Sequence, residues 1–170
     1  KSLDYFKNKI GEAELQDGHF DSPYNLSERL RIFLPDDITA ITCLDDKRAA
    51  SQIVLTLREI VLPQQRKALV LFTSNRLLEE VHNQLKNVVS AEFAGTEILA
   101  QGFSGSRRRM HNRFMSADAA ILLGSASYWE GIDFSDQAVE ILVVTRLPFD
   151  PPHRPENVAF QAYHQDQGKK

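Results

Sequence analysis

The sequence predicts an α/β domain in which helices cover both faces of a mostly parallel β-sheet. Short, continuous apolar runs, typical of strands buried on both faces, alternate with segments whose apolar residues recur at helical spacing. A helix between successive strands is the usual connection in a parallel sheet. Capping and turn residues separate these segments, so each predicted element has a defined start.

Length and composition are those of one ordinary domain. The 170 residues are 42% hydrophobic and 25% charged, which excludes collagen-like, coiled-coil and wholly disordered chains. The net charge of −3 provides no global basic field, so any contact with nucleic acid must come from a local patch. The single cysteine, Cys43, excludes an internal disulfide, and its apolar surroundings in the sequence predict a core position.

We expect a cytoplasmic domain that belongs to a longer protein. No apolar stretch approaches the roughly 20 residues that span a membrane, and the first residues lack the pattern of a signal peptide. The chain begins without a methionine and stops directly after a helical pattern.

Two strands joined by a turn are predicted before the first long helix. The first 25 residues predict at most a short helix, because glycines and Pro23 interrupt them. Leu30–Leu34 and Ile38–Cys43 are rich in apolar residues, and residues 35–37 between them are typical of a turn.

The first long helix follows this turn region. Asp45 or Asp46 supplies its N-cap, and apolar residues recur at helical spacing from Ala49 to Val61. Pro63 is predicted to end it, because proline does not continue a helix.

Strands and helices then alternate to the end of the chain. The predicted strands are the apolar runs at 68–72, 97–100, 119–123 and 139–144. Three further helices are predicted. The first has Leu77, Leu78, Val81 and Leu85 on one face, the second runs from Ser106 to Met115 with Met110 and Phe114 on its inner face, and the last contains Val158, Ala162 and Tyr163.

Small polar residues follow each of these strands. They are Thr73, Ser74 and Asn75, then Gln101 and Gly102, then Gly124, Ser125 and Ser127, and last Thr145 and Arg146. The carboxyl ends of parallel strands share one edge, where ligands bind, and helix N-termini at that edge suit phosphate. Any one group is explained equally well by helix capping, but four groups at one edge favour a phosphate-bearing ligand.

The loop after the third of these strands carries a second signal. Glu130, Gly131 and Asp133 combine carboxylates with a flexible glycine, which suits a ribose hydroxyl or a phosphate. The alternative is structural, since the aromatic residues of this loop can cover the sheet edge. We expect both, with the aromatic residues packing and the other three residues binding.

An arginine run, Arg107–Arg109, begins the predicted helix at 106–115. Cations in the first turn oppose the helix dipole, and a bound phosphate would remove that conflict. Arg107 and Arg108 are therefore candidates for nucleic-acid contact, although an exposed arginine run is also typical of a solvated face.

Several catalytic patterns are absent from the sequence. It has no GxxxxGK[ST] phosphate loop, no GxGxxG dinucleotide fingerprint, no GxSxG elbow and no HExxH pair. We therefore expect no catalytic residue and no metal site within this chain.

Three stretches resemble the motifs of one helicase family. Ala68–Asn75 resembles motif IV, and Gly124–Phe134 resembles motif V of the XPD/DinG branch of superfamily 2 helicases. Arg146–Pro152 resembles the strand and loop that follow motif V in DinG proteins, and Ser22–Tyr24 resembles an early Ser-Pro-aromatic element. The resemblance covers nearly the whole chain.

Such proteins are ATP-driven motors with two RecA-like domains, and this chain resembles the second. The resemblance implies a three-layer RecA-like fold over residues 28–170, incomplete at its C-terminus, with residues 1–27 as a lead-in from the preceding domain. The Walker motifs of the first domain and the arginine-bearing motif VI are absent. We therefore expect this chain alone neither to hydrolyse ATP nor to unwind DNA.

The resemblance also assigns roles to residues. ATP and Mg²⁺ would lie between the two domains, held mainly by the first, with Glu130, Gly131 and Asp133 completing the site. Single-stranded DNA would be the other partner, in DNA repair or replication. The residues that would contact it are Thr73, Ser74, Asn75, Gln101, Ser125 and Ser127, together with Arg107 and Arg108 of the arginine run.

Two alternatives remain open. In the first, the motor half regulates a linked 3′–5′ exonuclease, which an acidic DxE motif upstream would favour, whereas four spaced cysteines would favour a form with an iron–sulfur cluster. In the second, the chain is a non-motor α/β module that binds a phosphate ligand or a protein, which a parent protein without a Walker A loop would favour.

Overall fold

The computed structural model describes residues 25–130, 134, 139–148 and the helical positions 155, 158, 159, 162 and 163. The chain divides between Asp37 and Ile38 into two units. The described part of the first unit contains a short helix, α2 (Leu26–Arg29). The second unit contains the sheet. The predicted domain boundary at residue 28 stays a prediction.

The strand predicted at Leu30–Leu34 is wrong. This segment has no regular secondary structure, and Ile32, Phe33 and Leu34 are exposed. β-propensity reflects packing on a sheet rather than a backbone preference. No described strand pairs with this segment, so its apolar residues alone do not make it a strand.

The strand predicted at Ile38–Cys43 is also wrong. Ile41–Cys43 forms a 3₁₀ turn, closed by hydrogen bonds from Cys43 N to Ala40 O and from Leu44 N to Ile41 O. In an extended strand the side chains would alternate between two faces, but in this turn they do not. Cys43 is therefore exposed rather than in the core.

The first long helix, α3 (Asp46–Thr56), begins as predicted. Asp45 is its N-cap and accepts a hydrogen bond from Arg48 N at 2.9 Å. The helical path continues through a π-helical turn at Leu57–Val61 and a 3₁₀ turn at Leu62–Gln64. Pro63 lies near the start of that last turn. A proline is tolerated at this position because its missing N–H would form no intrahelical hydrogen bond there.

The sheet has four parallel strands in the order β2-β3-β1-β4. They are β1 (Lys67–Leu71), β2 (Glu97–Ala100), β3 (Ala120–Gly124) and β4 (Ile141–Val144). All four predicted strands are confirmed, with small differences at their ends. In the register, Leu69 of β1 lies opposite Leu122 of β3 and Leu142 of β4.

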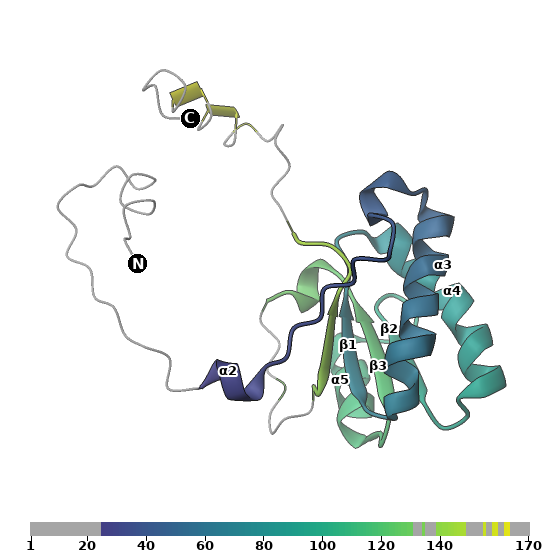
Figure 1. The fold of residues 1–170 in the computed structure, drawn as a ribbon. Coiled ribbons are helices and arrows are strands. Elements are labelled where there is room, and N and C mark those ends of the chain that lie inside the picture. The colour runs from purple at the N-terminus through teal and green to yellow at the C-terminus, as the bar shows by residue number, and fades with distance from the viewer. Residues whose placement is uncertain are drawn as a thin grey trace. The chain divides into compact units, whose positions relative to one another are not determined.

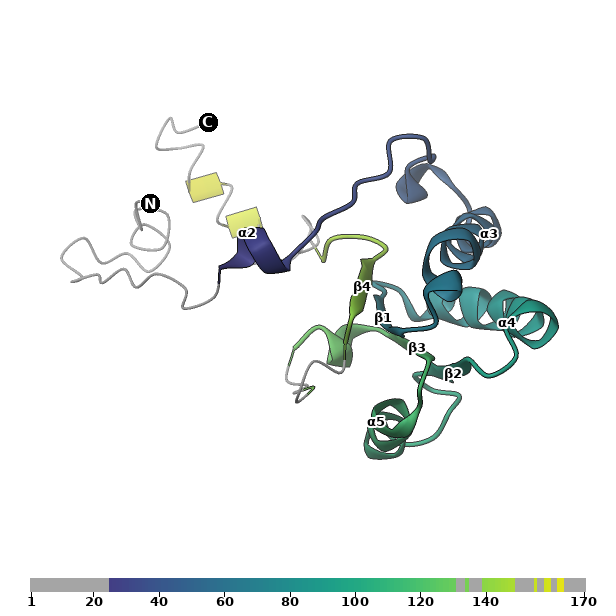
Figure 2. The same ribbon diagram turned by 60° about the horizontal axis from the view of Figure 1, so that its bottom comes forward.

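Helices cover both faces of this sheet, as predicted for a RecA-like fold. Helices α3 and α4 (Asn75–Glu92) lie on one face, and α5 (Arg107–Ser116) lies on the other (Figures 1 and 2). Alternate strand residues supply the two cores. Val70 packs in the α3–α4 core, whereas Leu69 packs with Met110 and Phe114 of α5. Of the predicted last helix, the described positions are helical and exposed.

The chain reverses sharply after β3. A 3₁₀ turn at Ala126–Tyr128 brings the Tyr128 ring back over Gly124, where an added Cβ would lie 2.5 Å from the Tyr128 Cβ and Cγ atoms. The next residue, Trp129, donates a hydrogen bond from Nε1 to the carbonyl oxygen of Phe72 at 2.9 Å. The end of β3 therefore requires a glycine at position 124, because the Tyr128 side chain leaves no room for a Cβ atom there.

We expect Gly124→Ala to lower the free energy of unfolding by about 1–3 kcal/mol, the usual cost of overpacking a core. Urea denaturation of the wild type and the variant measures this loss. The cost should be smaller in a Tyr128→Gly background, because the Cβ and ring atoms of Tyr128 that the added Cβ would meet are then absent. A Gly124→Ala protein as stable as the wild type would contradict the packing described.

Candidate functional site

The carboxyl ends of the four strands bring polar residues to one edge of the sheet. Thr73, Ser74 and Asn75 follow β1, Gln101 follows β2, and Ser125 follows β3. Hydrogen bonds continue the ladder past the strand ends, from Phe72 N to Gly124 O at 2.8 Å and from Gln101 N to Leu123 O at 3.0 Å. The edge predicted from the sequence is therefore present.

Ser125 joins the ends of three strands. Its side chain is buried, and its Oγ lies 2.5 Å from Asn75 Oδ1 and 3.2 Å from Gln101 Oε1. Its backbone N–H also donates to Gln101 Oε1, at 2.9 Å. The structure thus brings together three of the residues predicted to contact nucleic acid, and both amide oxygens face the same serine.

Two other strand-end hydroxyl groups bond to the backbone. Ser74 Oγ accepts from Leu77 N at 3.4 Å and caps α4. Thr145 Oγ1 donates to the carbonyl oxygen of Leu71 at 2.8 Å. Ser74 has the capping role that the sequence allowed as an alternative, whereas Thr145 bonds to β1 and caps no helix in the described part of the chain. Thr73 and Ser127 are exposed at the same edge.

The predicted arginines lie at the start of α5, which begins at this edge. Ser106 caps the helix, accepting from Arg109 N at 3.3 Å, and its first turn has no acidic residue. The Arg107 guanidinium lies 5.8 Å from the centroid of the Tyr128 ring, which places it beside the turn after β3. Arg108 is exposed and forms no ion pair with a described residue.

Tyr128 and Trp129 pack against the sheet, as expected for the aromatic residues of this loop. Tyr128 is 5% exposed, and its hydroxyl oxygen has no hydrogen-bond partner among the residues that the structure describes. Burial raises the pKa of the Tyr128 phenol, and the nearby Arg107 guanidinium opposes that change.

The predicted ATP-site residues lie mostly outside the described part of the chain. Glu130 is exposed one residue after Trp129. Gly131 and Asp133 are outside the described residues, so their roles stay predictions.

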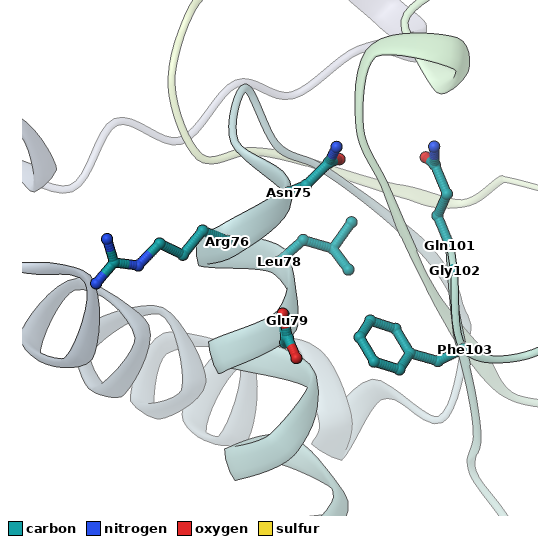
Figure 3. Close-up of a pocket in the computed structure, with 7 residues that line it drawn as sticks. All are labelled: Asn75, Arg76, Leu78, Glu79, Gln101, Gly102 and Phe103. Atoms are coloured by element: carbon teal, nitrogen blue, oxygen red, sulfur yellow. The ribbon is translucent and has the colours of Figure 1, made fainter.

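A pocket beside the Ser125 network was not predicted from the sequence. It has a volume of about 360 Å³ and lies between the start of α4 and the turn after β2 (Figure 3). Its lining consists of two amides, two oppositely charged side chains, two apolar side chains and a glycine, namely Asn75, Gln101, Arg76, Glu79, Leu78, Phe103 and Gly102. An aromatic residue in a short polar turn, two positions after Gln101, was the signal available in the sequence.

The wall of this pocket rests on a buried histidine of α4. The His82 ring lies 4.7 Å from the Phe103 ring, tilted by 36°. His82 is 7% exposed, and its Nδ1 has no hydrogen-bond partner among the described residues. Burial lowers the pKa of His82, Lys86 lowers it further, and Glu79 raises it.

Neither a metal centre nor a membrane segment is found in the part of the chain that the structure describes. No three of its histidine, cysteine, aspartate and glutamate side chains are grouped so as to hold a metal ion. No described helix is long and apolar enough to cross a membrane.

Comparison with known proteins identifies relatives over most of the chain. Residues 57–170 match the family model described as "Helicase C-terminal domain". The chain is 32% identical to the 3′-5′ exonuclease DinG of Bacillus subtilis, over 88% of this chain and 16% of that protein. It is 22% identical to the ATP-dependent DNA helicase YoaA of Escherichia coli, over 90% of this chain and 23% of that protein. The chain therefore spans less than a quarter of either relative.

The lowered pKa of His82 predicts a pH-dependent stability. An unfolded histidine takes up a proton near pH 6.5, whereas folded His82 does so at lower pH. The stabilisation that depends on neutral His82 is present above the unfolded pKa and is lost as the pH falls through the folded pKa.

We therefore expect the free energy of unfolding to fall between about pH 7.5 and about pH 5.5, and to fall less in His82→Leu. Urea denaturation at both pH values measures the difference. An identical pH dependence in the two proteins would contradict the buried, neutral state of His82.

Proposed function

The chain belongs to the helicase C-terminal domain family and is DinG-like, and on this premise we propose that it is the second RecA-like motor domain of an ATP-dependent DNA helicase. In this role it would contact single-stranded DNA and complete an ATP site formed with the first motor domain of the same protein. It would act in DNA repair or replication.

The joined strand ends support the contact with DNA. Ser125 holds Asn75 and Gln101 at the edge where ligands of parallel sheets bind. Arg107 and Arg108 lie at the start of α5, which begins at this edge, and add positive charge. Hydroxyl, amide and guanidinium groups contact phosphate and sugar without reading sequence. We infer that the domain binds single-stranded DNA without sequence preference, and that its affinity falls as the salt concentration rises.

The ATP side of the proposal rests on the residues after Trp129. Glu130, Gly131 and Asp133 would approach the nucleotide, with Gly131 near the phosphates and Asp133 at the ribose. Glu130 is exposed, so its carboxylate is free to face a neighbouring domain. A single carboxylate supplies only part of the oxygen shell of Mg²⁺. We therefore propose that the first motor domain holds most of the ATP and Mg²⁺.

A second candidate function has a specific observation in its favour. The Bacillus subtilis relative is named a 3′-5′ exonuclease. In this candidate the motor half regulates a nuclease domain elsewhere in the same protein. The two candidates share the ATP and DNA sites and differ in whether the full-length protein degrades a single strand from its 3′ end.

ATP hydrolysis by the full-length protein, with and without single-stranded DNA at one low salt concentration, tests the proposal. Stimulation by DNA is expected. Hydrolysis that ignores DNA would instead favour a regulatory or non-motor module. Degradation of a 3′-labelled strand in the same reactions would favour the nuclease-linked form.

We expect Asp133→Ala to lower DNA-stimulated ATP turnover by about tenfold or more, the loss expected for one hydrogen bond to a charged group of about 1.5–3 kcal/mol. Steady-state turnover of the full-length protein measures this. The matched control is Asp118→Ala, an exposed aspartate before β3 at the opposite edge of the sheet. Unchanged turnover in Asp133→Ala would refute its assignment.

We expect Arg108→Gln to weaken binding of single-stranded DNA and to reduce its salt dependence. Loss of one phosphate contact lowers the slope of log affinity against log salt by about 0.7 on a single strand. Fluorescence anisotropy titrations at several salt concentrations measure the slope. Arg66→Gln is the control, because Arg66 precedes β1 at the opposite edge. Equal slopes in wild type and Arg108→Gln would mean that Arg108 is only a solvated side chain.

A further inference from the structure

The pocket beside the Ser125 network has an aromatic wall held in place by the backbone. Phe103 N and Ser104 N both donate to the carbonyl oxygen of Ala100 at 3.0 Å, and Ser104 Oγ accepts from Ala100 N at 2.9 Å. Gly102 supplies the positive φ of 87° that this turn needs. The Phe103 ring packs on His82 and remains 48% exposed. A rigid turn therefore presents half of an aromatic ring to the outside.

The two amides of the pocket have a fixed orientation. Asn75 Oδ1 and Gln101 Oε1 both face Ser125. Figure 3 shows the two amide nitrogens pointing away from Leu78 and Phe103. No residue in the described part of the chain accepts a hydrogen bond from either NH₂ group. The two amides therefore line one end of the pocket without directing donors toward the aromatic face at the other end.

The charges of the pocket argue against a phosphate as its ligand. Arg76 points away from the other lining residues (Figure 3) and pairs with Asp46, Nε to Oδ2, at 2.9 Å. Glu79 adds a carboxylate to the lining. A phosphate would find no unpaired cation here and one like charge. A planar, uncharged ring suits the aromatic face of Phe103.

We propose that this pocket binds one nucleobase of the single strand, stacked on the exposed part of the Phe103 ring. The inference rests on the proposed function, since it requires a single strand at this edge of the sheet. The other proposed contacts are made to the sugar and phosphate groups of the DNA, whereas this contact is made to a base. Every base has a π-face, so stacking in this pocket would raise the affinity for single-stranded DNA without making it depend on sequence.

Binding of two strands of equal length by the full-length protein tests this inference. One is an oligothymidylate, and the other is the same sugar-phosphate backbone without bases. Phe103→Leu should weaken binding of the oligothymidylate by about tenfold, within the range measured for base–aromatic stacking, and leave binding of the abasic strand unchanged. Phe103→Trp should retain the wild-type preference for bases, because it keeps a stacking face.

Leu55→Ala is the matched control, because Leu55 is a half-exposed apolar residue of α3 outside the pocket. If Phe103→Leu binds both strands as the wild type does, or weakens both equally, the nucleobase pocket is wrong while the proposed DNA contact stands. If the wild type binds neither strand, the proposed function fails and this inference fails with it.

Discussion

One buried hydroxyl group joins the strand ends on which the proposed functional contacts depend. Ser125 is 3% exposed and bonds to the side chains that follow two other strands. A polar group buried this deeply must be paired, or its burial costs free energy. Asn75 and Gln101 meet that need, and in doing so their free NH₂ groups take fixed directions. The hydrogen bonds that satisfy the buried Ser125 hydroxyl and the proposed ligand contacts thus involve the same two side chains.

Much of the fold could be predicted because its signals are local. The strands are continuous apolar runs, and Asp45 caps its helix through a contact only three residues along the chain. The segments Leu30–Leu34 and Ile38–Cys43 have the composition of strands but no described strand to pair with. Whether a strand has a partner depends on segments that are distant in the sequence, so a single apolar run does not predict it.

The candidate site could be predicted in its position but only partly in its chemistry. Parallel topology brings the strand ends to one edge, so that position followed from the order of elements. The use of each hydroxyl did not, since Ser74 and Thr145 bond to the backbone whereas Ser125 bonds to side chains. The contact between His82 and Phe103 depends on how α4 lies against the turn after β2, which no spacing in the sequence encodes.

The hydrogen bond from Trp129 to the carbonyl oxygen of Phe72 ties two parts of the edge into one mechanical unit. Trp129 immediately precedes the residues proposed to approach ATP, and Phe72 immediately precedes those proposed to contact DNA. A displacement of the Trp129 side chain would therefore be transmitted through this hydrogen bond to the peptide that joins Phe72 to Thr73. In the proposed motor, this hydrogen bond would couple the residues at the ATP to those at the DNA, together with the contact between Ser125 and Asn75.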